Sequence, residues 1–245
     1  YTLTVGAASG TGTINDDDAA PTIQGVTSAT QVEGTALVHT VTLTNASSSS
    51  TSFAYTLGGG SATSGTDYTN PPTFSNGVTL VAGNLIVPAG VTSFTVTVPT
   101  TLDTIDEGAS ENYNLSVGGV AATGTITDDD NAPSIASVSS ANAVEATSIV
   151  HTVTLSNASS SNTSYTLSLA DVSATGGGTD YTSTLTNAAF SNGVTIAAGI
   201  ITVPAGVTSF TVTVPTTADT IDEANETYTL TVGAASGTGT INDDD

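Results

Sequence analysis

One 18-residue segment occurs twice in the chain without a single difference, at 1–18 and at 228–245. A close copy, YNLSVGGVAATGTITDDD, occupies 113–130, so the copies recur about every 110 residues. The segment PAGVTSFTVTVPTT recurs in the same way, at 88–101 and 204–217. A period of this length fits a whole domain rather than one turn of a solenoid. We therefore expect the terminal strands of a preceding repeat at 1–18, one complete repeat at 19–130 and a second at 131–245.

Within each repeat, the local signals are those of strands and turns. Residues 94–98 read Phe-Thr-Val-Thr-Val and alternate with period two, as do residues 40–44. Clusters of Ser, Asn and Gly, such as 45–52 and 58–65, separate these runs. No stretch has a helical period. The pattern predicts an all-β fold of tandem immunoglobulin-like β-sandwich domains, with about seven short strands each.

The charge inventory excludes several classes of partner. The chain has 22 Asp and Glu residues but no Lys or Arg, which gives a net charge of −22. Binding to nucleic acid or to an anionic membrane surface requires basic residues, so we expect neither partner. There is also no cysteine, which excludes disulfides and thiolate metal sites. Any cation that balances clustered carboxylates must therefore be a bound ion.

The acidic residues lie in four short segments per repeat, each beside the end of a predicted strand. All but Asp171 follow this pattern. A solvated linker explains one Asp run, whereas four recurring segments that converge at one pole of a sandwich favour a hard divalent cation. Calcium accepts about six to eight oxygen ligands in flexible geometry, and so suits acidic loops better than magnesium does.

Four motifs carry a family resemblance. They are VEG or VEA (32–34, 144–146), GTDY (65–68, 178–181), DTIDE followed by E-x-Y (103–113, 219–228), and a final TGTI-x-DDD. In this succession the chain resembles the Calx-beta domain, a calcium-binding sandwich of sodium/calcium exchangers and large bacterial surface proteins. The resemblance covers both repeats. One departure is the single Asp that opens each DTIDE loop, where exchangers have several.

The resemblance implies that calcium lies at one end of each sandwich. In the first repeat, the implied ligands are Glu33, Asp67, Asp103, Asp106, Glu107, Glu111, Asp128, Asp129 and Asp130. In the second repeat, they are Glu145, Asp180, Asp219, Asp222, Glu223, Glu226, Asp243, Asp244 and Asp245. The same role falls to the Asp run of the preceding repeat, Asp16, Asp17 and Asp18.

Other chemistry finds little support in the sequence. His39 and His151 are equivalent and in phase with apolar strand residues, so we expect partly buried strand histidines rather than metal ligands. One histidine per repeat makes no acid–base pair or triad. Paired carboxylates hydrolyse glycosides in other proteins, but a chain without Trp or Arg is poorly equipped to bind sugars. We expect no enzymatic activity.

These observations predict a calcium-stiffened extender of an extracellular adhesin or fibre on a bacterial cell surface. Its partners are then the neighbouring repeats of the same chain, without direct membrane contact. Two alternatives remain open. The chain is a subunit of a self-assembling filament or surface layer, in which residues 1–18 complete a neighbouring molecule, or it is a calcium sensor that regulates an attached domain.

Overall fold

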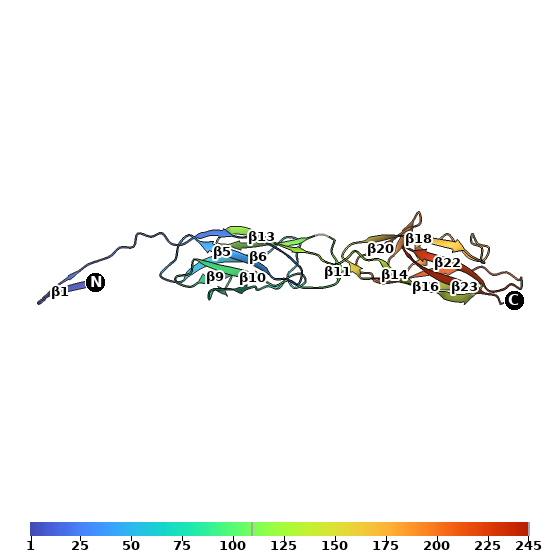
Figure 1. Cartoon of the computed structure of the whole chain (residues 1–245), viewed down its shortest axis with the longest axis horizontal. Helices are drawn as coiled ribbons and strands as arrows, with labels where there is room; N and C mark the ends of the chain where they lie inside the picture. Colours follow the sequence, from blue (N-terminus) through green and yellow to red (C-terminus); the bar gives the residue numbers. More distant parts are fainter. Residues whose placement is uncertain (109, 245) are drawn as a thin grey trace. The chain divides into compact units, whose positions relative to one another are not determined.

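The computed structural model describes residues 1–108 and 110–244 (Figure 1). Strands dominate these residues, which confirms the predicted all-β class. No helix among them is long and apolar enough to cross a lipid bilayer. The chain divides into two compact units, and their boundary does not follow the sequence repeats. Unit 1 comprises 1–31, 35–101 and 112–125, whereas unit 2 comprises 32–34, 102–111 and the chain from Ile126 onward.

The first two strands form a hairpin with the register of a repeat's last two strands. β1 (Thr2–Val5) and β2 (Ala8–Thr11) pair antiparallel in a two-stranded sheet, with Val5 opposite Ala8. At the end of the second repeat, β22 (Glu226–Val232) and β23 (Ala235–Asn242) place Val232 opposite Ala235 in the same way. The repeated sequence therefore forms the same local pairing in both places.

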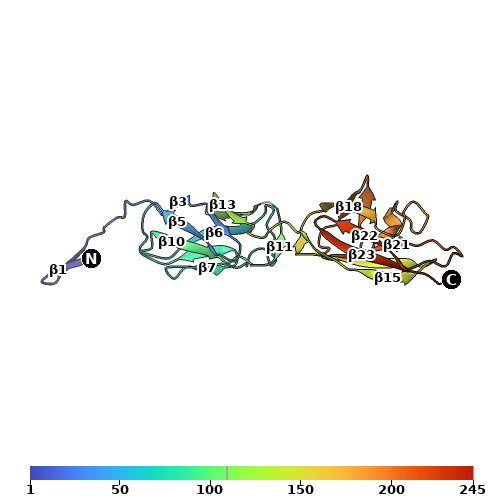
Figure 2. The ribbon, with the colours of Figure 1, turned by 45° about the vertical axis from the view of Figure 1, so that its right-hand side comes forward.

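The sandwich of residues 19–130 contains two sheets (Figure 2). One sheet has the order β3-β5-β10-β7 and the other β4-β13-β12-β6-β9-β8. The strands are β3 (Ile23–Val26), β4 (Ala29–Val32), β5 (Leu37–Leu43), β6 (Thr51–Gly58), β7 (Thr73–Phe74), β8 (Thr79–Val81), β9 (Asn84–Val87), β10 (Ser93–Val98), β12 (Glu111–Val117) and β13 (Val120–Thr127). A short strand, β11 (Ile105–Asp106), pairs outside these sheets.

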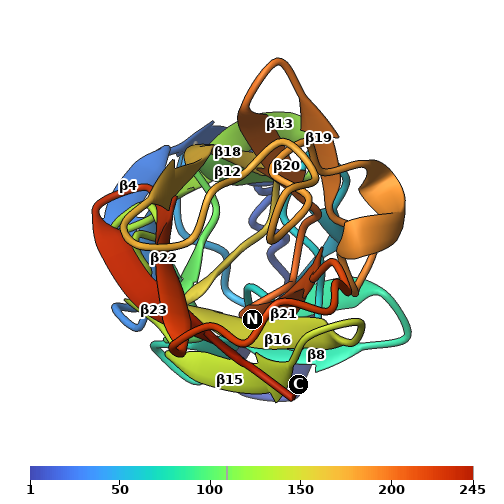
Figure 3. The same cartoon turned by 90° about the vertical axis from the view of Figure 1, so that its right-hand side faces the viewer.

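The second repeat, whose strands face the viewer in Figure 3, also contains two sheets. Its sheets have the orders β14-β16-β21 and β15-β23-β22-β18-β20-β19. A 3-10 turn, η1, occupies Asn187–Ala189. The strands besides β22 and β23 are β14 (Ile135–Val138), β15 (Ala141–Val144), β16 (Ser148–Leu155), β17 (Ala158–Ser159), β18 (Thr163–Asp171), β19 (Thr195–Ala197), β20 (Ile200–Val203) and β21 (Ser209–Pro215).

Alternation along the strands builds each core. In β10, Phe94, Val96 and Val98 are buried, and the residues between them are only partly covered. Each repeat contains more strands than the seven expected, because tight turns divide its middle segment into short pieces. Ala82 and Gly83, both with positive φ, form one such turn between β8 and β9.

The two histidines are more deeply buried than expected. His39 and His151 have no solvent exposure. Their burial is possible because both nitrogens of each ring have a hydrogen-bond partner. The Nδ1–H of His39 donates to the Thr27 carbonyl at 2.7 Å, and the Tyr113 hydroxyl donates to its Nε2 at 2.9 Å. Burial lowers the pKa of His39, which keeps it neutral. The histidine thus links the two sheets and has no nitrogen left for a metal.

A glycine beside the first acidic segment gives a stability prediction. Gly34 has φ +71°, and a Cβ there would lie 2.9 Å from the Leu102 Cβ. We expect Gly34→Ala to destabilise the domain by about 1–3 kcal/mol, from backbone strain and from this clash. The second repeat already has alanine at the position equivalent to Gly34, Ala146 with φ +58°, so its backbone accommodates a Cβ there. Ala146→Gly should instead be neutral or slightly stabilising in denaturant unfolding, and equal losses in both variants would contradict this explanation.

Candidate metal centre

The first candidate centre forms where β4 and β13 end side by side in one sheet. Glu33 follows β4, and its N–H donates to the Thr127 carbonyl at the end of β13 at 3.0 Å. The chain leaves β13 directly into the run Asp128, Asp129 and Asp130. Strand pairing therefore places the Glu33 carboxylate next to an Asp run almost one hundred residues later in the sequence.

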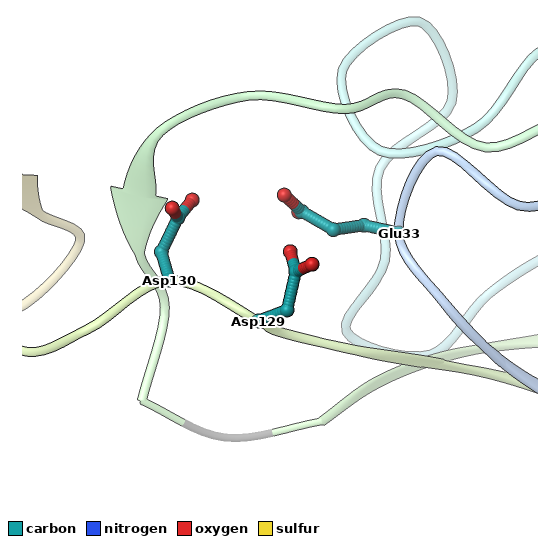
Figure 4. A group of neighbouring side chains, drawn as sticks. All are labelled: Glu33, Asp129 and Asp130. Atoms are coloured by element: carbon teal, nitrogen blue, oxygen red, sulfur yellow. The ribbon is translucent and has the colours of Figure 1, made fainter.

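Three carboxylates of this centre converge. Glu33, Asp129 and Asp130 each bring one oxygen within 4.8 Å of the other two, and Figure 4 shows these side chains gathered around a common space. Glu33 is only 6% exposed, and the Oδ2 atom of Asp130 is buried without a hydrogen-bond partner. Burial raises the pKa of Glu33, and the neighbouring Asp carboxylates raise it further. Burial and adjacent aspartates also raise the pKa of Asp130. A bound cation would offset both the cost of burying these carboxylates in their charged form and the repulsion between them.

The DTIDE loop closes over the first centre through its backbone. The Asp103 N–H donates to Glu33 Oε1 at 3.3 Å, and the N–H groups of Glu107 and Gly108 donate to Asp128 Oδ2 at 3.2 and 3.3 Å. Asp106 is 9% exposed. Backbone amides thus hold the carboxylates in place, and several carboxylate oxygens remain available as ligands.

In the second repeat, a pocket is lined by carboxylates from all four predicted segments, including Glu145, Asp180, Asp219 and Asp243. Asp180, Glu223 and Glu226 bring one oxygen each within 4.8 Å. The Asp219 N–H donates to Glu145 Oε2 at 3.0 Å, as Asp103 does to Glu33. The equivalent acids of the first repeat are Asp67, Glu107 and Glu111, of which Asp67 is 9% exposed. The segments that the sequence singled out therefore meet in the second repeat.

Some predicted ligands lie outside these groups. Asp16, Asp17 and Asp18 are exposed and belong to none of the carboxylate groups found among the described residues. Asp222 and Asp244 are also exposed, and Asp245 lies outside the described residues. Asp171, the acid outside the repeating pattern, accepts hydrogen bonds from the Tyr181 hydroxyl at 2.6 Å and the Gly176 N–H at 2.9 Å. It therefore holds the Gly-rich turn before Asp180.

Comparison with known families decides the identity of this arrangement. The Calx-beta domain model matches residues 16–139 and 128–242. The chain belongs to the Calx-beta family. Its two Calx-beta matches overlap at 128–139, so the Asp run that ends the first domain also begins the second match. The predicted boundaries at residues 18 and 130 remain predictions.

Solved structures give distant similarities. The calcium binding domain CBD12 of CALX1.1 is 14% identical, with 89% of this chain and 82% of that chain covered and a TM-score of 0.36. CBD12 from CALX1.2 is 15% identical, with 87% and 79% covered and a TM-score of 0.35. A chaperone–tip adhesin complex of CFA/I fimbriae is 12% identical, with 88% and 92% covered and a TM-score of 0.27. A comparison with curated proteins found no match.

The residues present fit the calcium that Calx-beta domains bind. The side-chain donors of both centres are carboxylates, which are hard oxygen ligands. The chain contains no Lys or Arg to neutralise them. The buried Asp130 Oδ2 atom, which has no hydrogen-bond partner, also fits a position beside a cation.

The second centre also yields a pH prediction. Burial, a hydrogen bond with Asp180 and nearby carboxylates raise the pKa of Glu226 from 4.5 to about 7. The folded, metal-free domain therefore holds a proton there that the unfolded chain has lost, and this stabilisation disappears as the pH rises through about 7. Calcium should displace that proton. We expect binding at about pH 6 to release protons, measured by calorimetry in buffers of different ionisation enthalpy.

The release should disappear above about pH 8, where Glu226 has already lost its proton. In metal-free protein, Glu226→Gln should flatten the fall in stability between pH 4.5 and about 7. A proton release that is the same at both pH values would show that Glu226 is not protonated in the free centre.

Proposed function

We propose that this chain binds calcium at one end of each Calx-beta domain, and that the bound ions stiffen it as an extender of an extracellular bacterial adhesin or surface fibre. The observation that carries the proposal is the convergence of carboxylates from four distant segments in a chain with no Lys or Arg. Like charges a few ångströms apart repel by about 1–4 kcal/mol per pair near a protein surface. A divalent cation removes that repulsion and joins the segments.

The extender role follows from the place of the first centre in the chain. Asp129 and Asp130 are two of its three converging acids, and the chain continues from them through Asn131 and Ala132 to Pro133. A cation bound there ties the start of the linker to Glu33 and restricts its freedom. Pro133 favours an extended backbone on its N-terminal side. Repeated domains joined in this way would project a distal binding domain from the cell surface.

The proposed setting also agrees with composition. A strongly acidic chain without cysteine suits an extracellular protein that uses metal ions in place of disulfides. The proposed partners are the neighbouring repeats of the same chain, with no nucleic acid and no direct membrane contact. The proposal assigns no catalytic step to the chain.

Small-angle scattering tests the stiffening. The distribution of maximum dimension should become longer and narrower with calcium than with a chelator at matched ionic strength. Added monovalent salt should reproduce only the screening part, because it supplies no directed coordination. Indistinguishable curves in the two conditions would exclude stiffening, even if calcium still binds.

A second candidate function is a self-assembling filament or surface-layer subunit, in which residues 1–18 complete a neighbouring molecule. The hairpin needs a covering partner in either function, a preceding repeat in an extender or a neighbouring molecule in a filament, since Tyr1, Leu3 and Val5 are 77%, 62% and 72% exposed. Their counterparts in the second repeat, Tyr228, Leu230 and Val232, are fully buried. Sedimentation of the intact chain distinguishes the two functions, because an extender stays monomeric and a filament subunit forms polymers.

A further inference from the structure

The sequence DTIDE occurs at 103–107 and again at 219–223, but the two copies have different structures. In the first copy, Ile105 and Asp106 form strand β11, and Asp106 is 9% exposed. In the second copy, Ile221 and Asp222 form no strand, and Ile221 is 60% exposed. The five residues are the same in both copies, so the source of the difference lies outside them, and one difference is a contact that the first copy makes.

The first copy has a partner in the loop that follows β16. Ile105 and Asp106 pair in parallel with Ala158 and Ser159 of β17. The Ser160 N–H donates to the Asp106 carbonyl at 2.8 Å, and the Ser159 hydroxyl donates to the same oxygen at 3.0 Å. Ser159 is 4% exposed. All these residues belong to unit 2, so this pairing is part of one compact unit.

The partner loop is preformed. Its counterpart in the first repeat, 45–49, makes the same internal hydrogen bonds although no strand pairs with it in the described structure. The side-chain N–H of Asn157 donates to the Ala158 carbonyl, as that of Asn45 does to the Ala46 carbonyl. The Ser161 N–H donates to the Ser159 hydroxyl, as the Ser49 N–H does to the Ser47 hydroxyl. The Gly206 N–H donates to the Ser159 carbonyl, as the Gly90 N–H does to the Ser47 carbonyl. The serine loop is thus a rigid edge, and the DTIDE loop is ordered where it meets that edge.

We propose that Ser159 and Ser160 of the second repeat are positioning residues for the first repeat's calcium centre. This inference rests on the proposed calcium binding. By fixing the Asp106 carbonyl, the two serines hold the segment whose flanking amides anchor Glu33 and Asp128. The ordering cost of that segment is then met before the ion arrives, which strengthens binding without a new ligand.

The experiment compares two matched double variants, Ser159→Ala/Ser160→Pro and Ser47→Ala/Ser48→Pro. The first pair removes both donors to Asp106, and each pair also removes the same hydrogen bond within its serine loop. Each is placed in a background with the second centre disabled by Asp180→Asn/Glu226→Gln, so that calorimetry reports the first centre alone.

We expect the Ser159/Ser160 variant to raise the calcium dissociation constant of the first centre by about three- to thirtyfold, as for the loss of one or two hydrogen bonds. The Ser47/Ser48 variant should leave it unchanged. Single Ser159→Ala avoids any folding defect from proline and should give a smaller shift in the same direction. Amide exchange at Glu107 and Gly108, measured without calcium, should quicken only in the Ser159/Ser160 variant.

Two failures are distinguishable. If the background protein binds no calcium, the proposed function fails at this centre. If it binds calcium and the Ser159/Ser160 and Ser47/Ser48 variants have equal dissociation constants, the positioning role is wrong and the pairing of β11 with β17 is only structural.

Discussion

Removing calcium is expected to lower the melting temperature of the chain by about 10 °C or more. The folded domains assemble carboxylates that the unfolded chain scatters, so calcium stabilises the folded state by mass action. At free calcium about 1,000-fold above the dissociation constant, the gain is about 4 kcal/mol per site. For a domain of roughly one hundred residues, each kcal/mol shifts the midpoint by about 4–8 °C. Differential scanning calorimetry with calcium and with a chelator measures the change.

The control is magnesium at the same ionic strength. Screening of the net charge of −22 by any divalent salt raises stability somewhat, but only a coordinated ion gives the full shift. Magnesium demands stricter octahedral geometry and should therefore recover only a minor part of the rise in melting temperature that calcium gives. A melting temperature that stays within about 2 °C after chelation would show that the carboxylate groups do not hold calcium.

The largest mutational effect on the free energy of unfolding is expected from Asp103→Asn/Asp106→Asn. The substitutions should destabilise the first domain when calcium is bound, but not when calcium is absent. Asp103 Oδ1 accepts the Ile105 N–H at 2.7 Å, and the carboxamide oxygen that replaces it can accept the same bond, so the loop keeps its shape. Without calcium, the variant loses two negative charges from a repelling group and should be as stable as the parent or more stable. With calcium, it should lose most of the roughly 4 kcal/mol that the ion supplies to this domain.

The second repeat supplies the matched variant, Asp219→Asn/Asp222→Asn. Each pair should weaken binding in its own domain and leave the other centre largely unaffected, since the carboxylate groups of the two repeats share no residue. Chemical shifts of the Gly108 and Glu226 amides during a calcium titration follow the centres separately. Equal loss in both centres from either pair would indicate one shared site or global unfolding.

The fold was predictable because it depends on local patterns and on repetition. Alternation in segments such as 93–98 specifies a half-buried strand, and a period of about 110 residues specifies whole domains. The convergence of Glu33 with Asp129 and Asp130 was predictable in outline, because acids at several strand ends of a sandwich meet at one pole. The family match confirms the Calx-beta resemblance drawn from these motifs.

What the sequence could not predict depends on tertiary neighbours. Asp106 and Asp222 lie in identical pentapeptides, so no local rule separates the buried residue from the exposed one. Asp106 pairs with Ser159, whose sequence neighbourhood reads as an ordinary polar turn, and Asp222 is in no strand of the described structure. The complete burial of His39 likewise depends on Tyr113, more than seventy residues away in sequence.

The central claim is that the converging carboxylates form calcium sites, and isothermal titration of the chelator-treated chain with calcium tests it most directly. We predict saturable binding that persists at physiological ionic strength, is weakened in the first domain by Asp103→Asn/Asp106→Asn, and is not reproduced by magnesium at equal concentration. A linear, unsaturable heat that is the same for calcium and magnesium would instead show that the acidic segments attract only a diffuse ion atmosphere, and would contradict the assignment of calcium sites.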